Sequence, residues 1–62
     1  MKINTKVIVH SKALYNAGRV GYFQFYGAGE KQNNATLTDE PTSVCDKSGN
    51  YFTVGRDEIK EL

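Results

Sequence analysis

The chain has 62 residues, a formal net charge of +1 at pH 7, a single cysteine and no tryptophan. A chain of this length forms one domain, residues 1–62, whose small core leaves no room for a deep, dry catalytic pocket without a metal or disulfide brace. One thiol cannot close an intramolecular disulfide, and no second Cys or His lies near Cys45 to form a zinc site. We therefore expect a binding protein with no cofactor, no metal and no enzymatic activity.

The apolar runs of the sequence are much shorter than a membrane span or the core of a signal peptide. A single unpaired cysteine is also typical of a reducing compartment. Both observations predict a cytoplasmic protein with no membrane partner. We expect Cys45 to be a small core or strand residue and not a nucleophile, because the one histidine, His10, is 35 positions away.

The small net charge hides an uneven distribution along the chain. Residues 1–31 contain five Lys or Arg and one acid, which gives +4, whereas residues 32–62 contain three Lys or Arg and six acids, which gives −3. An asymmetry of this kind indicates an interaction surface.

Alternation with period two predicts a first strand from Lys2 to Lys12. We expect its odd positions to point inward as one face: Ile3, Thr5, Val7 and Val9. We expect its even positions to point outward as a basic and polar face: Lys2, Asn4, Lys6, His10 and Lys12. Ser11 to Ala17 then forms a loop that closes in a tight turn at Gly18.

The middle of the chain predicts two further strands. Gly18 to Tyr26 is rich in β-branched and aromatic residues, which suit the pleated surface of a sheet. Two glycines and a polar run break this pattern from Gly27 to Asn34, which predicts a loop. Ala35 to Thr38 is a short third strand, and the sequence Asp39-Glu40-Pro41 ends it because proline cannot donate to a ladder.

The last third of the chain predicts a hairpin, in which a glycine-containing loop joins Ser43–Asp46 to Tyr51–Val54. Gly55 to Glu58 is long enough for one helical turn, and Ile59 to Leu62 alternates again as a closing strand. Five short strands with one turn before the last are typical of a small Greek-key or SH3-like barrel. The predicted fold is all-β, a small SH3-like five-stranded barrel with one 3₁₀ turn before the last strand.

Both ends of the chain resemble a known family. Thr5-Lys6-Val7-Ile8-Val9, followed by a loop and Gly18-Arg19-Val20-Gly21, is similar to the opening of SH3-like barrels of the KOW type. Phe52 to Ile59 is similar to the end of such barrels, where a 3₁₀ turn introduces the final strand. The resemblance implies binding to RNA, ribosomes, polymerase or other proteins. Domains of this size and composition also resemble small accessory proteins of bacteriophages.

The first functional hypothesis is a binding module that docks on a protein or nucleoprotein target, such as the transcription or translation machinery. Tyrosine and arginine dominate protein interfaces. The expected docking residues lie around the second strand and the loop from Gly27 to Asn34: Tyr15, Arg19, Tyr22 and Tyr26.

A second hypothesis is a single-stranded nucleic-acid binder, because a row of cations beside exposed aromatic rings suits phosphates and unpaired bases. The aromatic strand from Gly21 to Tyr26 would supply the rings, and the first strand would supply the cations: Lys2, Lys6, His10 and Lys12. The alternative is that Phe23 and Phe25 lie in the core, that Tyr22 and Tyr26 cover an edge of it, and that the lysines guard a strand edge.

A third hypothesis is a small inhibitor that occupies the nucleic-acid groove of a host enzyme. The acidic half of the chain would carry this activity: Asp39, Glu40, Asp46, Asp57, Glu58 and Glu61. Adjacent carboxylates on a strand point to opposite faces, so neither Asp39-Glu40 nor Asp57-Glu58 predicts an acid–base dyad. For Asp57-Glu58 we expect instead that the acids favour the amino end of a short helix.

Overall fold

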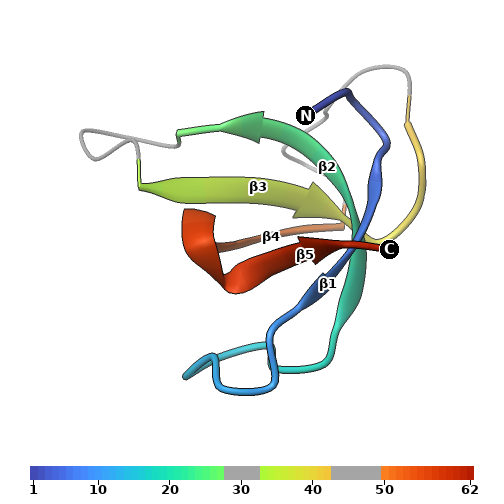
Figure 1. Cartoon of the computed structure of the whole chain (residues 1–62). Helices are drawn as coiled ribbons and strands as arrows, with labels where there is room; N and C mark the ends of the chain where they lie inside the picture. Colours follow the sequence, from blue (N-terminus) through green and yellow to red (C-terminus); the bar gives the residue numbers. More distant parts are fainter. Residues whose placement is uncertain (28–32, 43–49) are drawn as a thin grey trace.

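The computed structural model describes residues 1–27, 33–42 and 50–62, and its regular structure consists of strands and one 3₁₀ helix (Figure 1). The fold class predicted from the sequence is confirmed, with five strands, no α-helix in the described residues and a 3₁₀ turn before the last strand. In chain order the elements are β1 (Lys6–Val9), β2 (Val20–Tyr26), β3 (Asn34–Thr38), β4 (Tyr51–Gly55), η1 (Arg56–Glu58) and β5 (Ile59–Glu61).

The five strands form one antiparallel sheet with the order β4-β3-β2-β1-β5. The first four strands follow one another as a meander, and η1 reverses the chain so that β5 returns to pair with β1. Ile8 in β1 therefore has Val20 of β2 on one side and Lys60 of β5 on the other. Figure 1 shows that the sheet is strongly bent and twisted.

The core is formed by alternate residues of β1 to β4, because paired residues of antiparallel strands point to the same face. Leu37 at the centre of β3 is fully buried and pairs with Phe23 on one side and Phe52 on the other. Val54 pairs with Ala35 in the same way. The complete set of buried hydrophobic residues is Val7, Val9, Phe23, Ala35, Leu37, Phe52 and Val54.

Gly21 in β2 makes room for the ring of Phe52. A Cβ atom at this position would lie 2.9 Å from Cζ of Phe52 and 3.1 Å from Cβ of Leu37. Gly21 pairs with Val7 of β1, so its missing side chain lies on the core face of the sheet. The small residue lets the ring of a β4 residue reach across β3 to β2.

A buried polar cluster attaches the N-terminal segment to the sheet. The side-chain amide of Asn4 donates to the carbonyl of Thr42 at 2.9 Å, and its Oδ1 accepts from the Thr42 amide at 3.1 Å and from Nε2 of Gln24 at 3.0 Å. Gln24, which is 4% exposed, also donates to Oγ1 of Thr38 at 3.1 Å. Gln24 lies where the β2–β3 register shifts between Phe23 and Phe25. This bulge gives a buried amide to a cluster that joins three segments of the chain.

The predicted first strand, Lys2 to Lys12, is wrong in extent, since β1 covers only Lys6–Val9. Asn4 has a φ of 68°, and the Thr5 amide donates to the Lys2 carbonyl at 3.1 Å, which turns the chain before β1. Ile3 was expected to point inward and is 59% exposed. Period-two alternation continues through this segment in the sequence, but a left-handed residue ends the strand geometry.

The other strand boundaries differ less from the predicted ones. β2 begins at Val20 instead of Gly18, which has a φ of 80° and closes the predicted tight turn. β3 begins at Asn34, one residue before the predicted start. The first arm of the predicted hairpin, with Cys45, lies outside the described residues, and β4 pairs with β3.

The aromatic residues of β2 alternate as predicted as far as Phe23, and the bulge at Gln24 then reverses the faces on which Phe25 and Tyr26 lie. Phe23 is buried, as expected for a core residue, and Tyr22 and Tyr26 are half-buried. Phe25 is half-buried instead of buried because the bulge at Gln24 changes the face on which it lies. In the part of the chain that is described, no helix has the length and hydropathy needed to cross a bilayer.

Replacing the buried residues of β4 tests the core. Phe52→Ala should lower the free energy of unfolding by about 3 kcal/mol and Val54→Ala by about 1–2 kcal/mol, because each leaves a cavity. Thr53→Val, at the exposed position between them, should change it by less than about 0.5 kcal/mol. Urea unfolding of the three variants measures these differences. Unchanged stability in both core variants would contradict the placement of β4.

Candidate functional site

The loop between β1 and β2, residues 10–18, is held by hydrogen bonds. The Ala13 amide donates to the His10 carbonyl at 3.0 Å, and the Gly18 amide donates to the Val9 carbonyl at 3.0 Å. The Lys12 amide donates to Nδ1 of His10 at 3.1 Å. Ala13 packs against the core from within the loop. The loop is therefore fixed at its base and along one side.

Leu14 and Tyr15 lie in this loop with their side chains in solvent. Leu14 is 83% exposed and Tyr15 is 74% exposed, the two highest values among the described large hydrophobic residues. Single exposed hydrophobic residues are common on protein surfaces. Two such residues that follow one another on a hydrogen-bonded loop place two apolar side chains in solvent at one point of the chain, and we call them the Leu14–Tyr15 pair.

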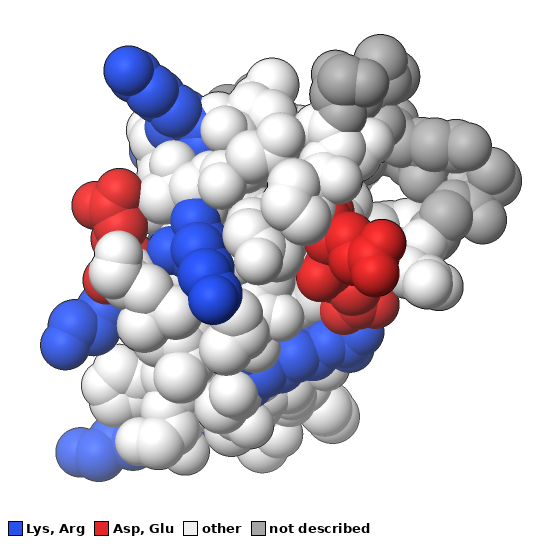
Figure 2. All heavy atoms as spheres, turned by 90° about the vertical axis from the view of Figure 1, so that its right-hand side faces the viewer, with Lys and Arg blue, Asp and Glu red and all other residues white. Residues whose placement is uncertain are grey.

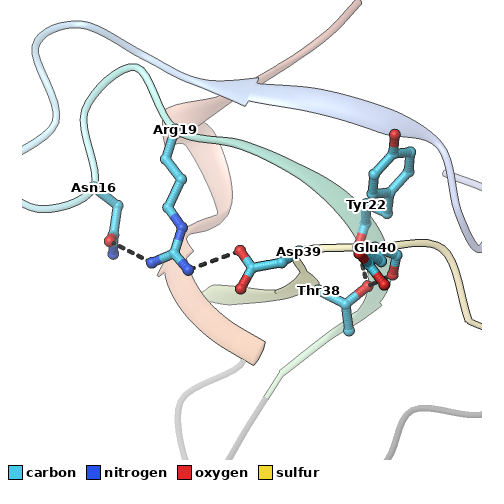
Figure 3. A network of polar contacts seen from close by, with 6 residues as sticks. All are labelled: Asn16, Arg19, Tyr22, Thr38, Asp39 and Glu40. Atoms are coloured by element: carbon cyan, nitrogen blue, oxygen red, sulfur yellow. Dashed lines mark hydrogen bonds and ion pairs between the residues drawn. The ribbon is translucent and has the colours of Figure 1, made fainter. Parts of the chain in front are cut away.

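Arg19 fixes the end of this loop to the rest of the sheet. Its guanidinium lies over the ring of Phe52, with Cζ 3.8 Å from the ring centroid. It also donates from Nη2 to Oδ1 of Asp39 at 2.7 Å and from Nη1 to Oδ1 of Asn16 at 3.2 Å. Figure 3 shows the guanidinium between these two side chains. Arg19, predicted as a docking residue, already has partners for its charge within the chain.

A second arginine is stacked on an aromatic ring at the opposite end of β2. Cζ of Arg56 in η1 lies 4.0 Å from the ring centroid of Tyr26, and this ring packs on Phe23 with a centroid distance of 4.6 Å. Arg56, Tyr26, Asn33 and Asp57 line an open depression of about 470 Å³. Arg56 was not among the residues predicted from the sequence, because no local pattern indicates that it lies over Tyr26.

The four predicted docking residues do not form one surface. Tyr15 and Arg19 precede β2, whereas Tyr26 is its last residue. Tyr22 lies on the outer face of β2, opposite Lys6, and Figure 3 shows it beside Thr38 and Glu40, away from Arg19. Tyr26 pairs with Ala35 and lies on the core side. Residues 28–32 of the predicted loop lie outside the described part of the chain.

The predicted row of cations does not follow a single strand. The four side chains are exposed, but turns at Asn4 and His10 separate Lys2 and Lys12 from β1. Lys6 lies opposite Tyr22 on the outer face. Figure 2 shows Lys and Arg side chains standing apart on the face it presents, with Asp and Glu side chains among them. The asymmetry of charge along the chain does not produce a segregated patch on this face.

The acidic residues have separate structural roles. Asp39 pairs with Arg19, and Glu58 accepts from the Gly55 amide at 2.8 Å, which caps η1 as a carboxylate at the start of a helical turn does. Asp57 and Glu58 line a second depression, of about 230 Å³, with His10, Lys12 and Ala13. No three metal-ligating side chains gather in residues 1–27, 33–42 and 50–62. Asp46 lies outside these ranges.

Comparison with protein-family models, with curated proteins and with solved structures finds no match for this chain.

Variants of Arg19 separate its ion pair from its stacking on Phe52. Asp39→Asn should lower the free energy of unfolding by less than about 1 kcal/mol, because the side chains of Arg19 and Asp39 are 40% and 36% exposed. Arg19→Ala should lower it further, since it also uncovers the Phe52 ring. Urea unfolding at low and high salt measures both effects. An equal loss in the two variants would show that stacking contributes nothing.

Proposed function

We propose that this protein is a non-catalytic binding module that docks on a protein or nucleoprotein through the loop of residues 10–18. The observation that carries the proposal is the exposure of the Leu14–Tyr15 pair on a loop whose backbone is hydrogen-bonded on both sides of the pair. Exposing a leucine and a tyrosine to water is unfavourable, and burying their apolar surface against a protein partner is favourable. Burying one aromatic side chain removes about 150–250 Å² from water.

The loop of residues 10–18 is ordered before a partner binds, which favours its use as a docking surface. A loop that is ordered only on binding loses conformational freedom at that moment, which reduces affinity. Here the hydrogen bonds to His10 and Val9 and the contacts of Arg19 hold the loop in the free protein. The partner would meet two apolar side chains already in place, surrounded by exposed polar residues such as Ser11 and Lys12. Apolar centres with polar rims are typical of protein interfaces.

Replacing the Leu14–Tyr15 pair should remove partner binding without unfolding the domain. Leu14→Ser with Tyr15→Ser should change the free energy of unfolding by less than about 0.5 kcal/mol, because both side chains are exposed. Wild-type protein on a resin should retain specific proteins from a nuclease-treated lysate, and the double variant should not. Tyr51→Ser, at a 41% exposed position outside the loop, is the matched control and should retain them. Identical captured proteins for all three would contradict the proposal.

A second candidate function, binding of single-stranded nucleic acid, rests on the outer face of the sheet. Lys6 pairs with Tyr22, and Lys60 pairs with Ile8, so both cations lie on the same face as a half-buried tyrosine ring. Cations beside an aromatic ring suit a phosphate backbone and a stacked base. This face replaces the predicted row of Lys2, Lys6, His10 and Lys12 as the site of the second candidate.

This second candidate predicts a specific salt dependence. Lys6→Gln with Lys60→Gln should weaken binding to a short single-stranded RNA and lower the slope of log affinity against log salt by about 0.7 per lost phosphate contact. Lys2→Gln with Lys12→Gln is the matched control with the same change of charge and should lower the slope less. Fluorescence anisotropy at two salt concentrations measures both. Absence of wild-type binding at low salt would eliminate this candidate.

A further inference from the structure

We propose that Arg56, stacked on Tyr26, is a binding site for a single carboxylate group of the partner protein. This inference rests on the proposed function for the kind of partner, and it concerns a different surface from the Leu14–Tyr15 pair. The carboxylate would come from an acidic side chain or from a chain terminus, which present the same group. The site is the open depression lined by Tyr26, Asn33, Arg56 and Asp57.

The guanidinium of Arg56 is held in a defined orientation. Its Cζ lies over the Tyr26 ring, 4.0 Å from the ring centroid, and that ring packs in turn on Phe23. The backbone amide of Arg56 donates to the Asn33 carbonyl at 2.6 Å, so the start of η1 is also fixed. A stacked guanidinium uses one face for the ring and leaves its edge of N–H donors free. That edge matches the two oxygens of a carboxylate.

Arg19 provides an internal comparison for Arg56. Both arginines lie over an aromatic ring, at 3.8 Å for Arg19 and 4.0 Å for Arg56. The edge of Arg19 is occupied by Asp39 at 2.7 Å. Arg56 has no ion pair or side-chain hydrogen bond with any residue of the described ranges. A carboxylate from a partner would pair with the guanidinium of Arg56 as the carboxylate of Asp39 pairs with that of Arg19.

Asp57 determines which anion the site favours. Its carboxylate lines the same depression, yet it makes no ion pair with Arg56. A nearby negative charge repels an incoming anion, and it repels a doubly charged one more strongly than a singly charged one. Because the charge of Asp57 offsets that of Arg56, the depression has little net charge to attract a phosphate group or an acidic cluster, and the match of two N–H donors to two oxygens favours a single carboxylate.

The depression is positioned to act together with the loop. Asp57 lines both this depression and the smaller one beside His10, Lys12 and Ala13 at the base of the loop. The His10 amide also donates to the Glu58 carbonyl at 2.6 Å, which joins the loop to η1. A partner seated on the Leu14–Tyr15 pair would therefore extend past the base of the loop to reach Arg56.

The test uses the full chain and the blocked peptide acetyl-Ala-Glu-Ala-amide, followed by NMR at the side-chain Nε–H groups of arginine. The peptide should shift the Arg56 signal saturably and leave the Arg19 signal unchanged. Acetyl-Ala-Gln-Ala-amide, which lacks the charge, should shift neither. Equal shifts with the two peptides, or equal shifts at the two arginines, would overturn the proposal.

Variants and a second anion complete the test. Arg56→Gln should abolish the peptide-dependent shift of the Asn33 side-chain amide, and Asp57→Asn should tighten peptide binding about two- to fivefold by removing a repulsive charge. Inorganic phosphate that binds more tightly than the glutamate peptide would overturn the choice of carboxylate. Leu14→Ser with Tyr15→Ser should leave the peptide response unchanged. A failure of the carboxylate site at Arg56 can therefore be distinguished from a failure of docking through the Leu14–Tyr15 pair.

Discussion

The structure depends on the register that places Leu37 between Phe23 and Phe52. A chain of 62 residues without tryptophan or a disulfide has few large side chains with which to exclude water. The pairing of β3 with both neighbours brings three of them together, and Gly21 allows the Phe52 ring to reach β2. A slip of one residue would turn these side chains to the outer face, so one register satisfies the core.

Because the core contains few large apolar side chains, the exposure of Leu14 and Tyr15 requires an explanation. In a domain with so little apolar material, Leu14 and Tyr15 would contribute to stability if the chain could bury them. The hydrogen bonds of the loop instead hold them in solvent, while Ala13 from the same loop packs on the core. Their exposure is therefore a property of an ordered loop and not of a frayed segment, which is why the proposed function rests on it.

The sequence predicted those features that depend on local patterns. Alternation placed Val7, Val9 and Phe23 in the core, and the segment from Gly55 to Glu58, long enough for one helical turn, became the N-cap residue and η1. The left-handed backbone at Asn4 was not predictable, because asparagine only tolerates that conformation and its side chain is satisfied by Thr42, 38 positions away. The same holds for the candidate site. Tyr15 was predicted as a docking residue from its residue type alone, whereas the position of Arg56 over Tyr26 depends on how β4 and β2 are arranged on either side of β3.

Arg19 and Arg56 share one arrangement, a guanidinium over an aromatic ring. At Arg19 it helps to hold the fold together, and at Arg56 it presents donors to a partner. Each covers a ring that the small core cannot enclose completely, which accounts for the position of the side chain in both cases. At Arg19 the chain also supplies the carboxylate, since Asp39 follows β3 at the same end of the sheet. At Arg56 the neighbouring carboxylate, Asp57, forms no ion pair, and the guanidinium has no side-chain hydrogen bond with residues 1–27, 33–42 or 50–62. The two arginines differ in whether the local backbone brings a carboxylate to them. The Arg56 donors that no described residue uses lie where η1 meets the base of the loop of residues 10–18.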